Sequence, residues 1–196
     1  MTEEEYRKKK LELYKKIADN QSFSEEKVTN NLLCKKCGGS CCKNYPCSFS
    51  PDDFVDINDF NYMKQILDTG FFVIDSFIDY QNKKNTYFIR CRGSQDKKGI
   101  FNFNSPYGNE CLLLYDTGCI FDFYTRPTAG ALLIPKSNKH GMGVCTNEYT
   151  YKKQKEDWEK HQDIMLKLIE YYANNKKMPK VSKIYKLEKI IRQDEI

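Results

Sequence analysis

The sequence predicts an α+β fold: a small antiparallel sheet with metal-stapled cysteine-rich loops, flanked by N-terminal and C-terminal helices. Apolar residues recur at helical spacing near both ends of the chain, at 3–18 and 150–174. Aromatic and β-branched residues instead dominate 71–80 and 85–92, which is typical of strands. Between the first helix and the strands, at 34–42, four cysteines fall within nine residues.

Length and composition favour a single domain, 1–196. The chain has 196 residues, of which 40% are hydrophobic and 14% aromatic, so it is long enough to bury a core. We expect N-terminal helices in 1–30, a metal-binding core in 34–145 and C-terminal helices in 150–192.

The charge pattern argues against a nucleic-acid partner. The net charge is +5, but residues 176–192 carry seven basic residues against one acid, so the rest of the chain is nearly neutral. No apolar run approaches the roughly 18 residues that a membrane span needs, and the charged start MTEEEYRKKK lacks the apolar stretch of a signal peptide. We therefore expect a cytoplasmic protein with no membrane association and with reduced thiols.

The first third of the chain contains two helix starts. Tyr6, Leu11, Tyr14 and Ile17 give 3–18 an apolar face, and Ser24 followed by acids predicts a second short helix that leads to Leu33. The cysteine cluster that follows is expected on loop and turn. Ser50-Pro51-Asp52-Asp53 then combines a cap, a proline and two acids, which predicts one or two helices to Leu67, ended by Gly70.

The middle of the chain should be mostly strand and loop. Segments 71–80 and 85–92 are expected to pair antiparallel, with Tyr87, Ile89 and Cys91 on one face of the second strand. A polar loop, 93–110, follows, with a candidate short strand at 100–103. Cys111 and Cys119 then flank an Asp-Thr-Gly turn, which predicts a hairpin.

The last third of the chain is predicted to be helical after a glycine-rich loop that carries His140 and Cys145. Pro179 breaks the long helix predicted over 150–174, and a short final helix then buries Ile184, Leu187 and Ile191. The apolar stripe of the long helix consists of Trp158, Gln162, Met165, Leu168, Ile169 and Tyr172.

The cysteine cluster indicates a metal site built from thiolates. Thiols so close together either oxidise or share a cation, and the reduced cytosol favours the cation. C-x2-C lets two sulfurs reach one ion across a tight turn, with Gly38 and Gly39 free to adopt positive φ. Thiolate is the ligand of zinc and of iron–sulfur clusters, so the sequence predicts zinc or iron. The predicted near ligands are Cys34, Cys37, Cys41 and Cys42.

The far ligands are expected from Cys111, Cys119 and Cys145, with Cys47 and His140 left open. A regular hairpin would place Cys111 about 13 Å from Cys119 along the strands, too far for one ion, so either the hairpin is irregular or only one of the two reaches the site. Adjacent side chains diverge in extended backbone, so Cys41 and Cys42 either serve two ions or include one structural thiol. Cys91 and His161 are expected to be packed residues, the latter on the long helix.

The motifs CKKCGGSCC at 34–42, SPDD at 50–53, CLLLYDTGCI at 111–120 and Arg126-Pro127, in this order, resemble the YkgJ-type cysteine-cluster family of zinc- or iron-chelating domains. The resemblance covers about the middle half of the chain. The family usually has a cysteine three residues after Arg-Pro, where this chain has Gly130, so Cys47 or Cys145 is expected in its place. The metal-associated thiols that the resemblance implies are Cys34, Cys37, Cys41, Cys42, Cys111 and Cys119.

The leading hypothesis is a cytosolic protein that chelates zinc or iron and serves as a structural or protein-interaction module, with another protein as its partner. The alternative is an iron–sulfur protein in electron transfer, or in methyl transfer to a protein lysine, since flagellin lysine methylases resemble the same family. A zinc-stabilised nucleic-acid binder that uses the basic tail with Tyr185 ranks last. No catalytic residue is assigned.

Overall fold

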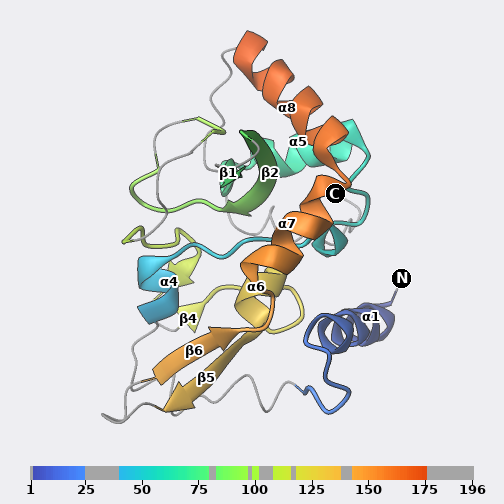
Figure 1. The fold of residues 1–196 in the computed structure, drawn as a ribbon, viewed down its shortest axis with the longest axis vertical. Helices are drawn as coiled ribbons and strands as arrows, with labels where there is room; N and C mark the ends of the chain where they lie inside the picture. The colour runs from blue at the N-terminus through green and yellow to red at the C-terminus, as the bar shows by residue number, and fades with distance from the viewer. Residues whose placement is uncertain are drawn as a thin grey trace.

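The computed structural model describes residues 2–24, 40–79, 83–96, 99–101, 108–115, 118–137 and 143–175. Figure 1 shows the longer helices along one side of the molecule and the short hairpins along the other. The elements in chain order are α1 (Glu3–Ile17), α4 (Ser40–Asn44), the 3-10 turn η1 (Pro51–Asp53), α5 (Phe60–Asp68), β1 (Phe72–Asp79), β2 (Lys84–Cys91), β3 (Leu114–Tyr115), β4 (Gly118–Cys119), α6 (Thr128–Ala131), β5 (Leu133–Ser137), β6 (Gly143–Asn147), α7 (Tyr151–Glu159) and α8 (Gln162–Asn175).

Each strand pairs with its neighbour in the sequence, so the described part of the chain holds three antiparallel two-stranded sheets. The predicted α+β class with small antiparallel sheets is confirmed. The predicted pair is β1 with β2, in which Phe72 lies opposite Cys91 and Asp79 opposite Lys84. Of the candidate strand at 100–103, Phe101 forms a parallel bridge with Ile74, and residues 102 and 103 lie outside the described residues.

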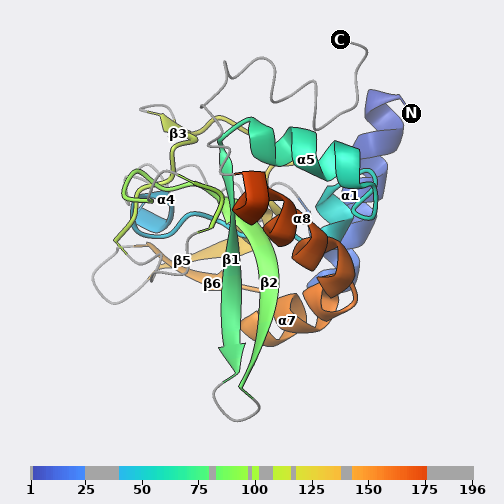
Figure 2. The ribbon, with the colours of Figure 1, turned by 90° about the horizontal axis from the view of Figure 1, so that it is seen from above.

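The main hydrophobic core lies between the β1–β2 hairpin and the helices α5, α7 and α8, which Figure 2 shows on one side of the hairpin. The predicted stripe faces this core, since Trp158, Met165, Leu168 and Tyr172 are buried. The stripe belongs to two helices, however, and the prediction of one helix over 150–174 was wrong.

Gln162 accounts for this break, because it is the first residue of α8 and its side chain is hydrogen-bonded to the backbone of β2 and of α7. Its amide accepts a hydrogen bond from the Tyr87 backbone N–H at 2.9 Å and donates to the Tyr87 carbonyl at 2.9 Å. It also donates to the Trp158 carbonyl at 2.8 Å. The side chain therefore fixes the junction of α7 and α8 against β2.

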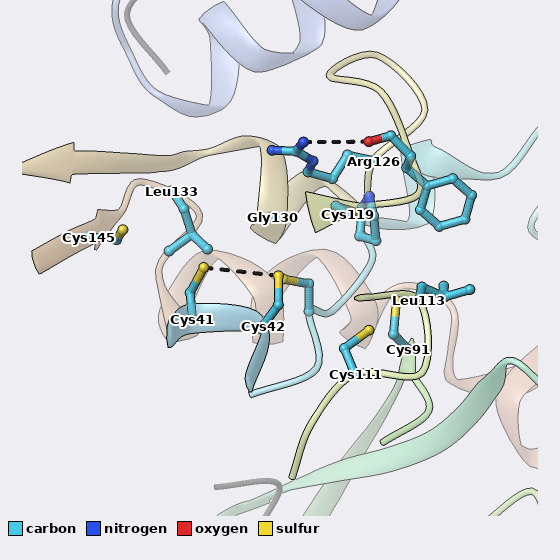
Figure 3. Close-up of a pocket in the computed structure, with 13 residues that line it drawn as sticks. Cys41, Cys42, Cys91, Cys111, Leu113, Cys119, Arg126, Gly130, Leu133 and Cys145 are labelled. Carbon is cyan, nitrogen blue, oxygen red and sulfur yellow. Dashed lines mark hydrogen bonds between the residues drawn. The ribbon is translucent and has the colours of Figure 1, made fainter. Parts of the chain in front are cut away.

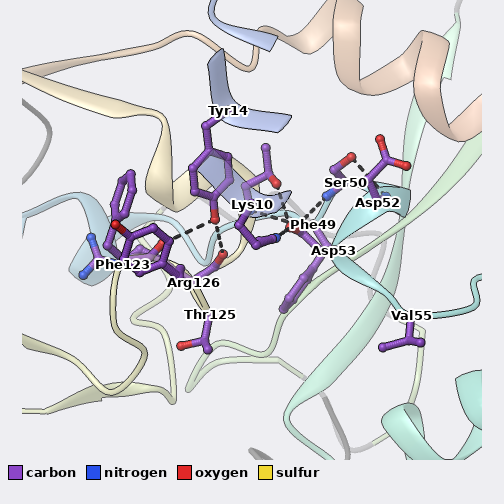
Figure 4. A network of polar contacts seen from close by, with 12 residues as sticks. Lys10, Tyr14, Phe49, Ser50, Asp52, Asp53, Val55, Phe123, Thr125 and Arg126 are labelled. Carbon is purple, nitrogen blue, oxygen red and sulfur yellow. Dashed lines mark hydrogen bonds and ion pairs between the residues drawn. The ribbon is translucent and has the colours of Figure 1, made fainter. Parts of the chain in front are cut away.

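The predicted N-terminal helix is confirmed as α1, which begins with a capping box of Thr2 and Glu5. Its buried face packs on a second, smaller core with α6 and Phe123. The Tyr14 hydroxyl donates to the carbonyls of Phe123 and Arg126, at 3.3 Å each (Figure 4). The helix therefore touches the segment that leads from β4 to α6.

The predicted start at Ser50 is also confirmed, although it opens a 3-10 turn and α5 begins separately after Asp59. Asp53 does more than its predicted role in the first turn. Its carboxylate accepts from the Ser50 backbone at 2.8 Å and from the Thr128 backbone and hydroxyl at 2.9 and 2.7 Å. It also forms a buried ion pair with Lys10 of α1 (Figure 4). One carboxylate thus joins α1, η1 and α6.

Two predicted helices lie outside the described residues: the one that leads to Leu33 and the one that carries Ile184. The predicted site residues Cys34, Cys37 and His140 also lie outside them. Among the helices that are described, none is long and apolar enough to cross a membrane.

Candidate metal centre

The seven described cysteines line one cavity of about 70 Å³ (Figure 3). They come from α4, from the segment that follows it, and from the strands or bridges of all three hairpins. All seven are thiols, with no disulfide among them. The cavity therefore collects thiols from the first third of the chain and from beyond position 110: Cys41, Cys42, Cys47, Cys91, Cys111, Cys119 and Cys145.

Cys41 and Cys42 lie in the short helix α4, so the prediction that the cluster occupies loop and turn was wrong for these two residues. Their sulfurs are hydrogen-bonded at 4.0 Å. Two sulfurs that each bind one zinc at about 2.3 Å in tetrahedral geometry lie roughly 3.8 Å apart. The helical backbone thus removes the geometric objection to adjacent ligands that extended backbone would raise.

Cys47 and Cys91 are held together by their backbones, because the Cys91 N–H donates to the Cys47 carbonyl at 2.9 Å. An antiparallel bridge between Ser48 and Arg90 continues this pairing. Cys91 was predicted to be a packed strand residue, and it is 2% exposed, but it also lines the cavity. The alternation of side chains along β2 does not predict that Cys91 lines the cavity. It assigns Cys91 to one face of the strand but does not show which residues cover that face.

Cys111 and Cys119 both reach the cavity, because the hairpin is short and irregular. Only Leu114–Tyr115 and Gly118–Cys119 pair as strands. Cys111 lies one turn earlier, where its carbonyl accepts from the Leu114 N–H at 3.1 Å. Its own N–H donates to the Cys42 carbonyl at 2.9 Å. Of the two alternatives that the sequence left open, the irregular hairpin is the one observed.

Cys145 lies on β6, opposite Pro135 of β5, and not on the glycine-rich loop where the sequence placed it. Its thiol is hydrogen-bonded to Cys41 of α4. This contact brings the β5–β6 hairpin to the side of the cavity that α4 forms.

The thiols perturb one another strongly around α4. Hydrogen bonds from Cys145 and Cys42 hold the pKa of Cys41 well below its ordinary value. Hydrogen bonds to Cys41 and Cys47, together with burial, raise the pKa of Cys42. Of these two adjacent thiols, Cys41 therefore loses its proton more readily than Cys42, as expected for coupled groups.

A second set of thiols lies toward β2. Burial raises the pKa of Cys91, and its hydrogen bond to Cys111 adds to the shift. The same hydrogen bond lowers the pKa of Cys111. Burial raises the pKa of Cys119, against the opposing charge of Arg126. Cys111 is thus the thiolate-favoured member of this set.

Arg126 is the one charged side chain among the described residues that line the cavity. Its Nη2 is 3.5 Å from the Phe121 carbonyl, whereas its Nε is buried without a hydrogen-bond partner among the described residues. An unsatisfied guanidinium N–H beside Cys119 suits an anionic sulfur cluster, whose negative charge it would offset.

The donor set fits a thiophilic metal, because the described lining offers seven sulfurs and neither carboxylate nor imidazole. Among the described residues, no three His, Cys, Asp or Glu side chains converge on one point at metal-binding distance. Cysteine has a single side-chain torsion that moves its sulfur, so closure around an ion requires rotations and leaves the backbone hydrogen bonds in place. His161 lies outside this lining and contacts Asn58 at 3.3 Å.

A larger cleft of about 790 Å³ adjoins the cavity and shares Cys41, Cys47 and Cys145 with it. Its wall carries aromatic side chains, among them Tyr45 and Tyr151, which are 42% and 57% exposed. Three of the thiols are therefore reachable from a space large enough for a small ligand.

Comparison of the chain with protein-family models, with curated proteins and with solved structures finds no match. The resemblance to the YkgJ-type family, and the role of Cys34 and Cys37, therefore stay predictions.

Proposed function

We propose that this protein binds zinc or iron through the cysteines of the cavity and serves in the cytoplasm as a structural or protein-interaction module. The observation that carries the proposal is the meeting of seven thiols from distant parts of the chain around one cavity. Thiols packed only for their apolar character would not need to share one lining. Cys34 and Cys37 are predicted to join them.

A metal held this way would crosslink the fold, because its ligands come from α4, β2, β4 and β6. A crosslinked surface of this kind suits the binding of another protein, which is the partner class that the nearly neutral body favours.

Metal analysis of the full chain tests this proposal. Protein purified without oxygen and with thiols reduced should hold zinc or iron near one equivalent or more, and Cys42→Ser should reduce that content. Ile89→Val, a buried change outside the cavity lining, is the control and should retain the metal. Neither zinc nor iron in the wild-type protein would refute the proposal.

The second candidate is an iron–sulfur protein that transfers electrons, or methyl groups to a protein lysine. The cleft that reaches Cys41, Cys47 and Cys145 favours it, since a structural site is closed whereas a reactive one keeps an open side. An iron–sulfur cluster would supply the redox chemistry, and Arg126 would offset its charge. Anaerobically purified protein should then be brown and absorb broadly at about 400 nm, and a colourless sample would exclude this candidate.

A further inference from the structure

The cavity contains more thiols than one ion uses. Four thiolates complete a tetrahedral zinc site, whereas seven described cysteines line this cavity. A surplus thiol can be an ordinary packed residue, because a buried cysteine behaves as a small apolar side chain. The arrangement of the sulfurs, and not their number alone, therefore decides how many ions they suit.

The contacts divide six of the thiols into two groups. The helix group consists of Cys41, Cys42 and Cys145: the Cys41 and Cys42 sulfurs lie 4.0 Å apart, and both Cys41 and Cys145 line the adjoining cleft as well as this cavity. The strand group consists of Cys91, Cys111 and Cys119, which come from β2, from the bridge to Gly93 and from β4, and none of which lines the adjoining cleft.

Cys47 is the seventh thiol and lies between the groups. Its sulfur is hydrogen-bonded to Cys42 of the helix group. Its carbonyl accepts a hydrogen bond from the Cys91 N–H of the strand group at 2.9 Å. On its other side, a Cβ atom at Gly130 would lie 3.1 Å from the Cys47 sulfur, so the glycine leaves the room that this sulfur takes.

We propose that the cavity takes two thiolate-bound divalent metal ions, one in the helix group and one in the strand group, bridged by the sulfur of Cys47. Each group of three then gains Cys47 as a shared fourth ligand, which completes two tetrahedral sites from seven sulfurs. This inference rests on the proposed metal-binding function and adds the number of ions and two ligands, Cys47 and Cys91.

The backbone holds the two groups at a fixed separation. The Cys111 N–H donates to the Cys42 carbonyl and the Cys91 N–H to the Cys47 carbonyl, each at 2.9 Å. One hydrogen bond thus joins a strand-group residue to the helix group, and the other joins the strand group to Cys47.

Cadmium is the probe for this centre, because Cd²⁺ prefers thiolates as zinc does and ¹¹³Cd is visible by NMR. The full chain, reduced and stripped of metal, is titrated with ¹¹³Cd²⁺. We expect two bound ions per chain and two resonances, each split by coupling through the shared sulfur. One bound ion would overturn the two-ion centre but leave the proposed function intact, and none would end both. Two unsplit resonances, as expected if Cys34 or Cys37 supplies an eighth ligand, would overturn the bridge.

Three variants assign the sulfurs. Cys145→Ser should lower the affinity for one ion by at least about tenfold, and Cys91→Ser should lower the affinity for the other. Cys47→Ser should lower the affinity for both ions. Ile89→Val, a buried change next to Cys91 in β2, should keep both ions. Equal weakening of the two ions by Cys145→Ser, or no effect of Cys47→Ser, would overturn the assignment. If Cys91→Ser does not fold, the wild-type spectrum decides the number of ions alone.

Discussion

The sulfur of Cys47 lies 3.1 Å from the point that a Cβ atom of Gly130 would occupy. Position 130 is where the YkgJ-type resemblance expects a cysteine, three residues after Arg126-Pro127. In this chain the thiol of Cys47 lies beside that position, and both residues line the cavity. Of the two replacements that the sequence suggested, Cys47 thus has a direct geometric relation to Gly130.

Gly130→Ala should therefore disturb the metal site. The added methyl group would meet the Cys47 sulfur at 3.1 Å and the Arg126 side chain at 3.2 Å, both tighter than ordinary packing. We expect zinc affinity to fall by about tenfold or more, measured by competition with a chromogenic chelator. Ala131→Gly, a change in the same short helix, should lower stability while leaving zinc affinity within a factor of about two. Unchanged affinity in Gly130→Ala would contradict the crowding.

Local sequence patterns were sufficient for the parts of the fold that depend on neighbours in the chain. The spacing of Tyr14 and Ile17 was enough to predict α1 and its buried face, without the cap at Thr2. Ser50 and its proline gave the start of η1, and the β-branched run gave the β1–β2 pair. The two helix starts depend on contacts within a few residues, and the strand pair joins segments that are adjacent in the sequence.

Tertiary contacts decided what the patterns missed. The break before α8 depends on Gln162 and the backbone of Tyr87, which are 75 residues apart. The short helix at Cys41 and Cys42 could not be predicted from the sequence, because no apolar residues recur there at helical spacing. Cys91 reads as a strand residue because its partners in the cavity come from α4 and from beyond position 110. The face of β2 on which Cys91 lies was predictable, but the residues that pack against that face were not.

Asp53→Ala should be among the most destabilising changes outside the cavity. It would leave the buried ammonium of Lys10 unpaired and remove the acceptor of the Thr128 N–H. Breaking such a pair costs about 3–5 kcal/mol, which urea unfolding followed by the fluorescence of Trp158 would measure. Asp52→Ala, an exposed neighbour, should change the free energy of unfolding by no more than about 0.5 kcal/mol. Equal effects of the two variants would contradict the role of Asp53.

Asp96→Asn should change how stability depends on pH. The side chain of Asp96 is buried, which opposes its charge, but its hydrogen bonds with Arg90 and the Gly93 N–H prevail and lower its pKa. A lowered pKa contributes stability that is present above the unfolded value of about 3.9 and is lost as pH falls through the folded value. We expect the variant to be about 1–3 kcal/mol less stable at pH 7, with the difference shrinking below about pH 4.

Asp163→Asn is the control for this pH series, because Asp163 is exposed on α8 and has no part in the Arg90 network. Its free energy of unfolding should follow that of the wild type across the series. A gap between Asp96→Asn and the wild type that stays constant down to pH 2 would show that the charge of Asp96 is not what stabilises the fold.

Zinc should stabilise the folded chain in proportion to its affinity, because the ligands are brought together only on folding. At a free zinc concentration 100 times the dissociation constant, the free energy of unfolding should rise by about 2.7 kcal/mol per ion. Two independent ions at that concentration would give about twice that increase, so the stability titration is an independent count of the ions in the cavity. Cys41→Ser and Cys91→Ser should each remove about half of the increase. An increase that survives in the double variant would place the zinc outside the cavity.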